Sequence, residues 1–252
     1  MEGSPRDTFI TIYGRKPVLE ALADDSIEID KVLLATGARE QSAKDIVAAA
    51  ERRGVRLERM AAEKITRISR NGRHDQGVVA DVVAPGMRPV PDYVAALERD
   101  AGPQRLLVLD GVTNPANVGM ILRTATAAGL AGVVLPHQGV PEVGPLVIKA
   151  SAGVAYRASI LRSQTAEDAL QALQDAGFAL FALGGEASTT IFDADYPARA
   201  AFVLGSETHG VSEPVARWVH EWIRIPMAGG VESLNVSSAA TALAFELVRR
   251  AG

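Results

Sequence analysis

Residues 225–236 read IPMAGGVESLNV and carry the most information about the fold. The first residues predict the end of an apolar strand, the glycine pair predicts a turn, and Asn235 predicts the start of a helix. Glycine tolerates the backbone dihedrals of a tight turn, and an asparagine cap leaves helix N–H groups facing outward. A segment of this kind presents backbone donors and acceptors to a ligand.

Two further segments have the same construction. Residues 109–129 read LDGVTNPANVGMILRTATAAG and residues 202–213 read FVLGSETHGVSE, and each runs from an apolar strand into a small or polar turn. A charged residue, Asp110 or Glu207, follows the strand in each case. Three such turns in one half of the chain predict one composite site.

The composition indicates a globular protein without a metal centre. The chain has 252 residues, 48% of them hydrophobic, which suffices for one large domain or two ordinary ones. It has no cysteine, and its four histidines (His74, His137, His209, His220) lack the spacing of a metal site. No apolar run is long enough to cross a bilayer, and residues 1–8 lack a signal-peptide core and are expected to form a flexible leader. We therefore expect a cytoplasmic protein with no metal and no membrane partner.

Positive charge is concentrated in one segment, although the formal net charge is −4. Residues 52–73 contain eight arginines and lysines but only two glutamates. Such local density favours phosphate binding, and the candidate contacts are Arg56, Arg59, Arg70 and Arg73. The same pattern is also typical of a solvated helix surface, and the composition does not separate the two readings.

Strands and helices alternate along the chain and predict an α/β fold in two domains. Residues 9–84 form the smaller, first domain. Three prolines and a glycine in residues 84–91 deny helix and ladder bonding, so we place a linker at residues 85–103.

In residues 104–252, nearly unbroken apolar strands separated by helices predict a parallel sheet covered on both faces. Ligands of such sheets bind at the carboxyl ends of the strands, where the three turns fall. The strands are expected near residues 106–110, 132–135, 156–160, 178–183, 201–204 and 222–226.

The sequence argues against a nucleotide-binding loop. No GxGxxG follows an expected strand, and GSETHG at residues 205–210 is followed by Val211, where a phosphate loop requires lysine. A dinucleotide or ATP site is therefore not expected.

Several polar residues have an ordinary reading and a functional one. Asn114 is expected to cap a helix that Gly129 ends, and the apolar stripe of this helix leaves out Asn117 and Arg123. Taken alone, Arg123 reads as a solvated arginine, Glu207 as a turn carboxylate and residues 233–235 as a helix cap. Their combination in one order favours the functional reading.

That order resembles the SpoU (TrmH-like) branch of the SPOUT RNA 2′-O-ribose methyltransferases. The family's Asp-Pro-x-Asn-x-Gly turn with an Arg-Thr-Ala helix is similar to residues 109–129, its Leu-Gly-x-Glu turn to residues 204–207, and its Ile-Pro-Met…Ser-Leu-Asn-Val-Ser motif to residues 225–237. KASAGVAYR at residues 149–157 resembles a further family segment. IYGRKPVLEAL and HDQGVVA, at residues 12–22 and 74–80, look like the ribosomal-protein-like RNA-binding domain of many members. Asn114 and His209 depart from the family pattern, and His209 is assigned no role.

The resemblance implies a methyl transfer from S-adenosylmethionine to an RNA ribose 2′-hydroxyl, with S-adenosylhomocysteine as product. It also implies a C-terminal trefoil knot, a homodimer and an RNA partner, with large-subunit (23S) ribosomal RNA as the first choice and transfer RNA as the second. An inactive RNA-binding assembly factor and a base-nitrogen methyltransferase are the alternatives. The implied cofactor-binding residues are Leu183, Gly184, Leu204, Gly205, Ile225, Met227, Ser233 and Leu234.

Arg123, Asn117, Glu207 and Asn235 are the catalytic residues that the resemblance implies. Lowering a free guanidinium pKa to about 7 would cost roughly 9 kcal/mol, which argues against Arg123 as a general base. Electrostatic stabilisation of the developing alkoxide requires no such shift and is preferred, with Asn117 and Glu207 expected to fix the guanidinium and the ribose.

Overall fold

The structure, a computed structural model, describes residues 9–97 and 102–251. These residues divide into two compact units, one comprising residues 9–85 with Val143–Pro145 and the other comprising residues 86–142 with residues 146 onward. The leader expected at residues 1–8, and residues 98–101 of the expected linker, lie outside the described residues.

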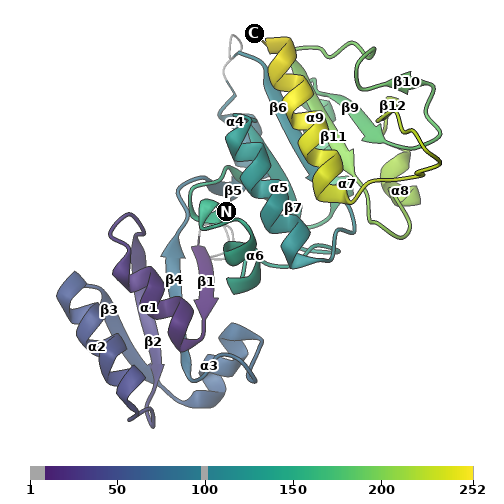
Figure 1. Ribbon diagram of the computed structural model, residues 1–252. Helices are drawn as coiled ribbons and strands as arrows, with labels where there is room; N and C mark the ends of the chain where they lie inside the picture. The colour runs from purple at the N-terminus through teal and green to yellow at the C-terminus, as the bar shows by residue number, and fades with distance from the viewer. Residues whose placement is uncertain (1–8, 98–101, 252) are drawn as a thin grey trace. The chain divides into compact units, whose positions relative to one another are not determined.

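The first unit is a small α/β domain, as predicted (Figure 1). Its sheet has the order β1-β4-β2-β3, in which β4 is antiparallel to β1 and β2, and β3 is parallel to β2. Ala43, Ile46 and Ala50 recur at helical spacing and form the buried face of α2, which ends at Gly54 with a φ of 65°. The elements are β1 Phe9–Tyr13, α1 Arg15–Ala23, β2 Ile29–Ala35, α2 Gln41–Arg53, β3 Arg56–Met60, α3 Ala62–Ser69 and β4 Val78–Val83.

Asp75 organises the turn that leads into β4. Its buried carboxylate accepts hydrogen bonds from the hydroxyls of Ser69 at 2.9 Å and Thr66 at 3.0 Å, and from the backbone N–H of Gly77 at 2.8 Å. Gln76 and Gly77 both have positive φ, which favours glycine at the second position. The HDQG segment therefore has a structural task in this unit.

The second unit is built on an eight-stranded sheet with the order β10-β12-β9-β11-β6-β7-β8-β5. Every registered pair in this sheet is parallel, as predicted. Its strands are β5 Met87–Pro89, β6 Gln104–Leu109, β7 Gly132–Pro136, β8 Ile160–Ser163, β9 Ala179–Leu183, β10 Thr189–Thr190, β11 Arg199–Leu204 and β12 Glu221–Arg224. Its helices are α4 Val90–Ala95, α5 Pro115–Ala127, α6 Pro145–Ala150, α7 Ala166–Asp175, α8 Glu213–Ala216 and α9 Val236–Ala251.

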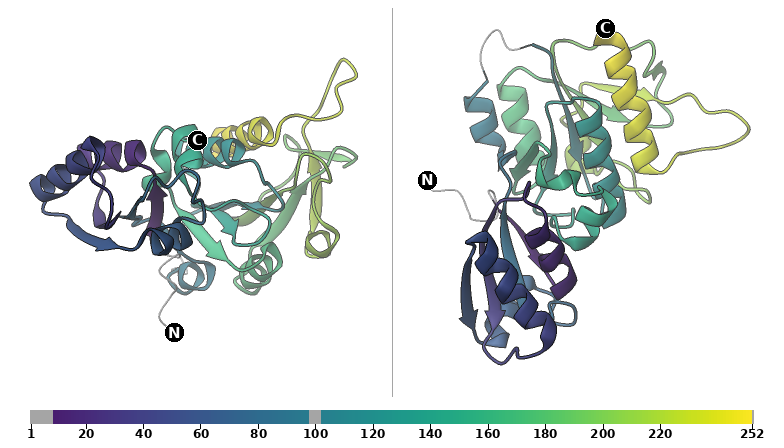
Figure 2. Two further views of the ribbon diagram at one scale, coloured as in Figure 1. Left: turned by 90° about the horizontal axis from the view of Figure 1, so that it is seen from below. Right: turned by 60° about the vertical axis from the view of Figure 1, so that its left-hand side comes forward.

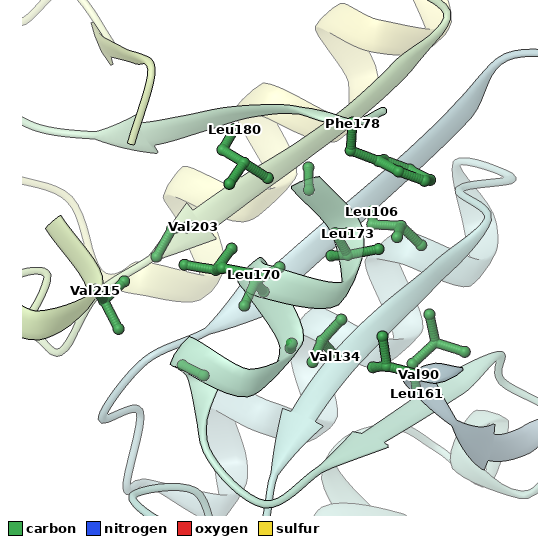
Figure 3. Packing of buried hydrophobic residues seen from close by; sticks show 14 of the residues in the cluster. Val90, Leu106, Val134, Leu161, Leu170, Leu173, Phe178, Leu180, Val203 and Val215 are labelled. Atoms are coloured by element: carbon green, nitrogen blue, oxygen red, sulfur yellow. The ribbon is translucent and has the colours of Figure 1, made fainter. Parts of the chain in front are cut away.

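Helices cover both faces of this sheet. α5 and α9 lie side by side on one face, and α4 and α7 lie on the other (Figure 2). Beneath α7, Leu170 and Leu173 pack against Leu106, Val134 and Phe178 in a hydrophobic core (Figure 3). Burial of these side chains fixes the sheet, and with it the positions of the loops at its carboxyl edge.

Two local predictions are wrong. Residues 84–91 do not exclude ladder bonding, because Met87–Pro89 pairs with β8; β5 is an edge strand, where proline is tolerated. The strand expected at residues 156–160 begins only at Ile160, because Val154–Tyr156 forms a 3-10 turn. The Ser151 hydroxyl accepts a hydrogen bond from the Ala155 N–H at 3.2 Å within this turn, a contact that apolar periodicity does not reveal.

The C-terminal end of α9 is fixed by charge. Glu246 accepts hydrogen bonds from Arg249 at 2.8 Å and from Arg250 at 2.6 Å. The hydrogen bond from Arg249 is the main cause that lowers the pKa of Glu246 to about 2, against the opposing effect of burial and with support from Arg250. Arg250 also donates to the carbonyl of Ala194 at 2.5 Å, so the helix end is tied to the segment that follows β10.

Candidate active site

The three turns singled out in the sequence meet at the carboxyl edge of the second sheet. A cleft of about 950 Å³ opens where β9, β11 and β12 end, and the segment between β12 and α9 forms one wall. All eight residues predicted to bind the cofactor line this cleft. Leu183 and Gly184 are at the end of β9, Leu204 and Gly205 at the end of β11, and Ile225, Met227, Ser233 and Leu234 in the segment after β12.

The turn after β11 requires glycine at position 205. Ser206 and Gly210 exchange two backbone hydrogen bonds of 2.9 Å, and the Ser206 hydroxyl accepts from the His209 N–H at 3.0 Å. A Cβ at Gly205 would lie 2.1 Å from the carbonyl carbon of Gly210. The turn is therefore closed so tightly that only glycine fits, which holds Glu207 at the rim of the cleft.

A second close approach shapes the end of β9. A Cβ at Gly184 would lie 2.7 Å from Cε3 of Trp222, so the indole packs directly on this glycine. The backbone N–H of Gly184 donates to the carbonyl of Ile223 at 2.9 Å. The wall formed by residues 183–184 is thus supported by β12.

Helix caps position two of the predicted catalytic segments. Asn114 accepts a hydrogen bond from the Ala116 N–H at 2.9 Å and caps α5, as predicted. Asn235 accepts from the Ser237 N–H at 2.9 Å and from the Ser237 hydroxyl at 2.6 Å at the start of α9. The cap reading of Asn235 is confirmed, and its amide nitrogen remains available for a further contact.

Asn117 connects the other two polar residues of the cluster. Its side chain is 3% exposed, its Nδ2 donates to Oε1 of Glu207, and its Oδ1 accepts from Nδ2 of Asn235 at 3.2 Å. The three side chains come from α5, from the turn after β11 and from the residue before α9. The structure therefore joins Asn117, Glu207 and Asn235 into one hydrogen-bonded chain beside the cleft.

Arg123 does not join this cluster. It is exposed on α5 and makes no hydrogen bond or ion pair with the part of the chain that the structure describes. The expectation that Asn117 and Glu207 fix its guanidinium is wrong for a single chain, because residues six positions apart lie on different faces of a helix. Asn117 faces inward, whereas Arg123 points to the surface.

The predicted RNA-binding arginines are all exposed in the first unit. Arg56 and Arg59 lie on β3, and Arg70 and Arg73 follow α3. Arg56 pairs with Glu58 at 2.6 Å and Arg59 makes a long contact of 3.5 Å with the Ala35 carbonyl. Arg53, from the same basic run, is different: it donates to the carbonyls of Ala21 at 3.0 Å and Ile27 at 2.7 Å and serves packing.

The cleft also contains charged residues that the sequence reasoning missed. Glu186, Arg224 and Glu232 line it together with Glu207. Arg224 directly precedes the IPM segment, so its position beside Ile225 was the available signal. Glu186 and Glu232 lie in loops, where the spacing of residues in the sequence does not predict which way a side chain points.

Two features are not found among residues 9–97 and 102–251. No group of three or more histidine, aspartate or glutamate side chains could hold a metal ion. No helix combines the length and apolar character that crossing a bilayer requires.

Comparison with protein-family models gives two matches. Residues 104–245 match the SpoU rRNA Methylase family, and residues 11–87 match the model for RNA 2′-O ribose methyltransferase substrate binding. The two ranges cover the second and first units of the fold, respectively.

Named relatives match over almost the whole chain. The chain is 33% identical over 239 residues to 23S rRNA (guanosine-2′-O-)-methyltransferase RlmB of Xylella fastidiosa, covering 95% of this chain and 96% of the relative. It is 34% identical to the RlmB of Ralstonia nicotianae, with 95% of each chain covered. An uncharacterized tRNA/rRNA methyltransferase of Mycolicibacterium smegmatis is 32% identical, with 98% of this chain and 79% of the relative covered.

Two solved structures have a similar fold. The AdoMet-bound rRNA methyltransferase from Sinorhizobium meliloti is 25% identical with a TM-score of 0.65, covering 97% of this chain and 88% of that one. The SpoU methyltransferase AviRb from Streptomyces viridochromogenes, at 24% identity and a TM-score of 0.65 over 98% of this chain and 91% of that one, shares the fold. With its motifs gathered at one cleft and both domains matched, the chain belongs to the SpoU rRNA methylase family.

Proposed function

We propose that this protein transfers a methyl group from S-adenosylmethionine to the 2′-hydroxyl of a ribose in ribosomal RNA, with 23S RNA as the substrate. The observation that carries the proposal is the convergence of three separate motifs on one cleft, with Asn117, Glu207 and Asn235 hydrogen-bonded beside it. The RlmB relatives, which match both units, support the choice of RNA.

The cleft suits the cofactor in size and in chemistry. Its volume of about 950 Å³ is within the usual range for small-molecule sites. Backbone groups around Gly205 and apolar side chains such as Ile225 and Leu234 provide an adenosine-sized, partly apolar wall. When bound, S-adenosylmethionine supplies a methyl group on a positively charged sulfur, which the carboxylates of the cleft favour over a neutral ligand.

The protein's task in this reaction is positioning and charge stabilisation. The cluster around Asn117 holds α5, the Glu207 turn and the start of α9 in one arrangement. In the proposal Arg123 binds the phosphate next to the target ribose and stabilises the developing alkoxide, while the hydroxyl proton passes to water, so no deprotonated guanidinium is required. Its exposed guanidinium, which pairs with no described residue, is suited to an incoming phosphate.

The proposal includes a homodimer and a trefoil knot formed by the C-terminal segment. Met120 on α5 and Phe245 and Val248 on α9 are 39%, 49% and 41% exposed, and the two helices lie side by side. A second copy of this face would bury these side chains. Sedimentation at micromolar concentration should show a dimer, and a stable active monomer would contradict this part.

In the proposal the first unit binds the RNA through its exposed arginines while the second performs the transfer. Because the proposed substrate is ribosomal RNA, the proposal also includes a cytoplasmic location. Transfer RNA remains the second candidate, since the mycolicibacterial relatives carry a tRNA/rRNA name.

Ribose-methylation mapping tests the function. Purified protein, S-adenosylmethionine and unmodified ribosomal or transfer RNA are incubated and the RNA is hydrolysed with alkali, which a 2′-O-methyl group blocks at one linkage. A single protected position in 23S RNA is expected. Protection only in transfer RNA would change the substrate; a methylated base without protection, or cofactor binding with no methylation of any RNA, would overturn the proposed reaction.

A further inference from the structure

Arg224 has a position that distinguishes it from the other charged residues of the cleft. Among the described residues that line the cleft it is the one cation, beside Glu186, Glu207 and Glu232. Its side chain is half-buried, yet it makes no hydrogen bond and no ion pair with any described residue. It does not pair even with Glu186 or Glu232, which line the same cleft. A guanidinium without a protein partner has all five of its N–H donors available to solvent or to a ligand in the cleft.

The backbone of Arg224 is held firmly. It is the last residue of β12, opposite Thr190 of β10, and its carbonyl accepts from the Ile191 N–H at 2.9 Å. The following residue, Ile225, is part of the same cleft wall. The guanidinium is therefore presented from a rigid strand end and not from a mobile loop.

Arg250 provides a comparison within the same unit. Its guanidinium pairs with Glu246 at 2.6 Å and donates to the carbonyls of Ala194 at 2.5 Å and Ile191 at 3.0 Å. Arg250 thus uses its donors to hold the fold, whereas those of Arg224 remain available to a ligand in the cleft.

We propose that Arg224 is a specificity-determining residue that binds the α-carboxylate of the methionyl end of the cofactor. This inference rests on the proposed function, because it assumes that the cleft holds S-adenosylmethionine. That molecule has two positive groups, its sulfonium and its ammonium, and one negative group, its carboxylate. The single cation among the described residues of the lining, beside three carboxylates, matches the single anion of the ligand. A guanidinium binds a carboxylate with two parallel hydrogen bonds.

In this assignment Arg224 binds the amino-acid end of the cofactor and does not contact the adenosine. S-adenosylhomocysteine carries the carboxylate, whereas 5′-methylthioadenosine has the same adenosine and thioether but no amino-acid end. Removal of the guanidinium should therefore weaken the first ligand and leave the second unchanged. A merely structural role would weaken both equally.

Calorimetric titration of the full chain with both ligands tests the proposal. For Arg224→Gln we expect an affinity for S-adenosylhomocysteine at least about tenfold lower, the effect of a lost charge-assisted pair, and an unchanged affinity for 5′-methylthioadenosine. Arg224→Lys keeps the charge without the paired donors and should show a smaller loss for the first ligand only. Arg217→Gln, an exposed arginine paired with Glu213 on α8, is the matched control and should bind both ligands like the wild type.

Several outcomes would overturn the proposal. Equal weakening of both ligands by Arg224→Gln would mark a structural role. Unchanged S-adenosylhomocysteine binding together with weaker RNA binding would make an RNA phosphate the partner. If Arg224→Gln fails to fold, the same comparison with Arg224→Lys decides. Wild-type protein that binds neither ligand would refute the proposed function itself, whereas tight wild-type binding that Arg224→Gln does not alter refutes only this inference.

Discussion

The side-chain amide of Asn117 donates a hydrogen bond to a carboxylate oxygen of Glu207, which lies 90 residues further along the chain. Asn117 also accepts a hydrogen bond from Asn235 at 3.2 Å. One buried side chain therefore ties together the start of α5, the turn after β11 and the start of α9. Because both ends of the Asn117 amide are used, only a group with one donor side and one acceptor side fits there.

Asn117→Asp should destabilise the protein at neutral pH. The substitution replaces the donor by a carboxylate oxygen that faces Glu207, and a buried hydrogen bond lost in this way costs about 1–3 kcal/mol of unfolding free energy. When two carboxyls are adjacent, the pKa of one of them rises, and its protonated form can donate a hydrogen bond. Part of the lost unfolding free energy should therefore be recovered below about pH 5. Thermal unfolding as a function of pH measures this. Asn114→Asp, which keeps the acceptor of an exposed cap, is the control, and equal stability of both variants at pH 7 would contradict the role of Asn117.

Arg123→Ala should abolish most of the methyl transfer without affecting the cofactor. In the proposal Arg123 donates to the developing oxyanion once RNA is bound, and loss of one such donor typically lowers the rate about 10²- to 10³-fold. Single-turnover transfer to RNA and calorimetry with S-adenosylhomocysteine measure the two quantities separately. Arg217→Ala should retain full activity. Nearly wild-type transfer by Arg123→Ala would show that the proposed active site is wrong.

Gly205→Ala should disturb the turn that carries Glu207. The added methyl group would lie 2.1 Å from the Gly210 carbonyl carbon and 2.3 Å from the Val211 nitrogen, so the backbone must move. Overpacking of this kind costs about 1–3 kcal/mol, and binding of S-adenosylhomocysteine should weaken. At Gly37 a Cβ meets nothing within 4 Å, so Gly37→Ala is expected to bind like the wild type. Normal binding by Gly205→Ala would mean that this turn does not shape the site.

Glu246 should contribute stability that acid removes. Its pKa in the folded protein, about 2, is below the ordinary value of 4.5, so the folded state binds fewer protons than the unfolded state between these values. The contribution is fully present above pH 4.5 and is lost as the pH falls toward 2. Glu246→Gln should therefore melt below the wild type at pH 7, with a difference that shrinks over this window. Glu213→Gln, in an exposed pair, should show no such difference, and a constant gap for Glu246→Gln would count against the argument.

Replacement of Arg56, Arg59, Arg70 and Arg73 by glutamine should weaken RNA binding and flatten its salt dependence. Each phosphate contact to a single strand makes the slope of log K against log salt more negative by about 0.7. Loss of four contacts should therefore make this slope less negative by roughly 3. Filter binding at several salt concentrations measures the slope, and the affinity for S-adenosylhomocysteine should not change. A slope equal to that of the wild type would favour the solvated-surface reading of this segment.

Local patterns in the sequence were sufficient for the layers of the fold. Apolar runs predicted the parallel strands, Asn114 and Asn235 predicted the helix starts, and the glycine-rich turns predicted the edge at which the cleft opens. These signals are local because strand burial, capping and turn dihedrals depend on near neighbours in the chain. The family motifs added the order of the turns.

Only the tertiary structure decided which side chains meet. Along the chain, Arg123 is much closer to Asn117 than Glu207 is. In the folded protein, however, Asn117 binds Glu207, and Arg123 faces solvent. The same holds for Arg224, whose place in the cleft follows from the pairing of β12 with β9 and β10. Contacts between residues far apart depend on how the sheet is ordered and which helix face is buried, and these are set by packing of the whole unit. The sequence by itself determined the elements and their turns, and the packing of those elements selected the polar groups that share one site.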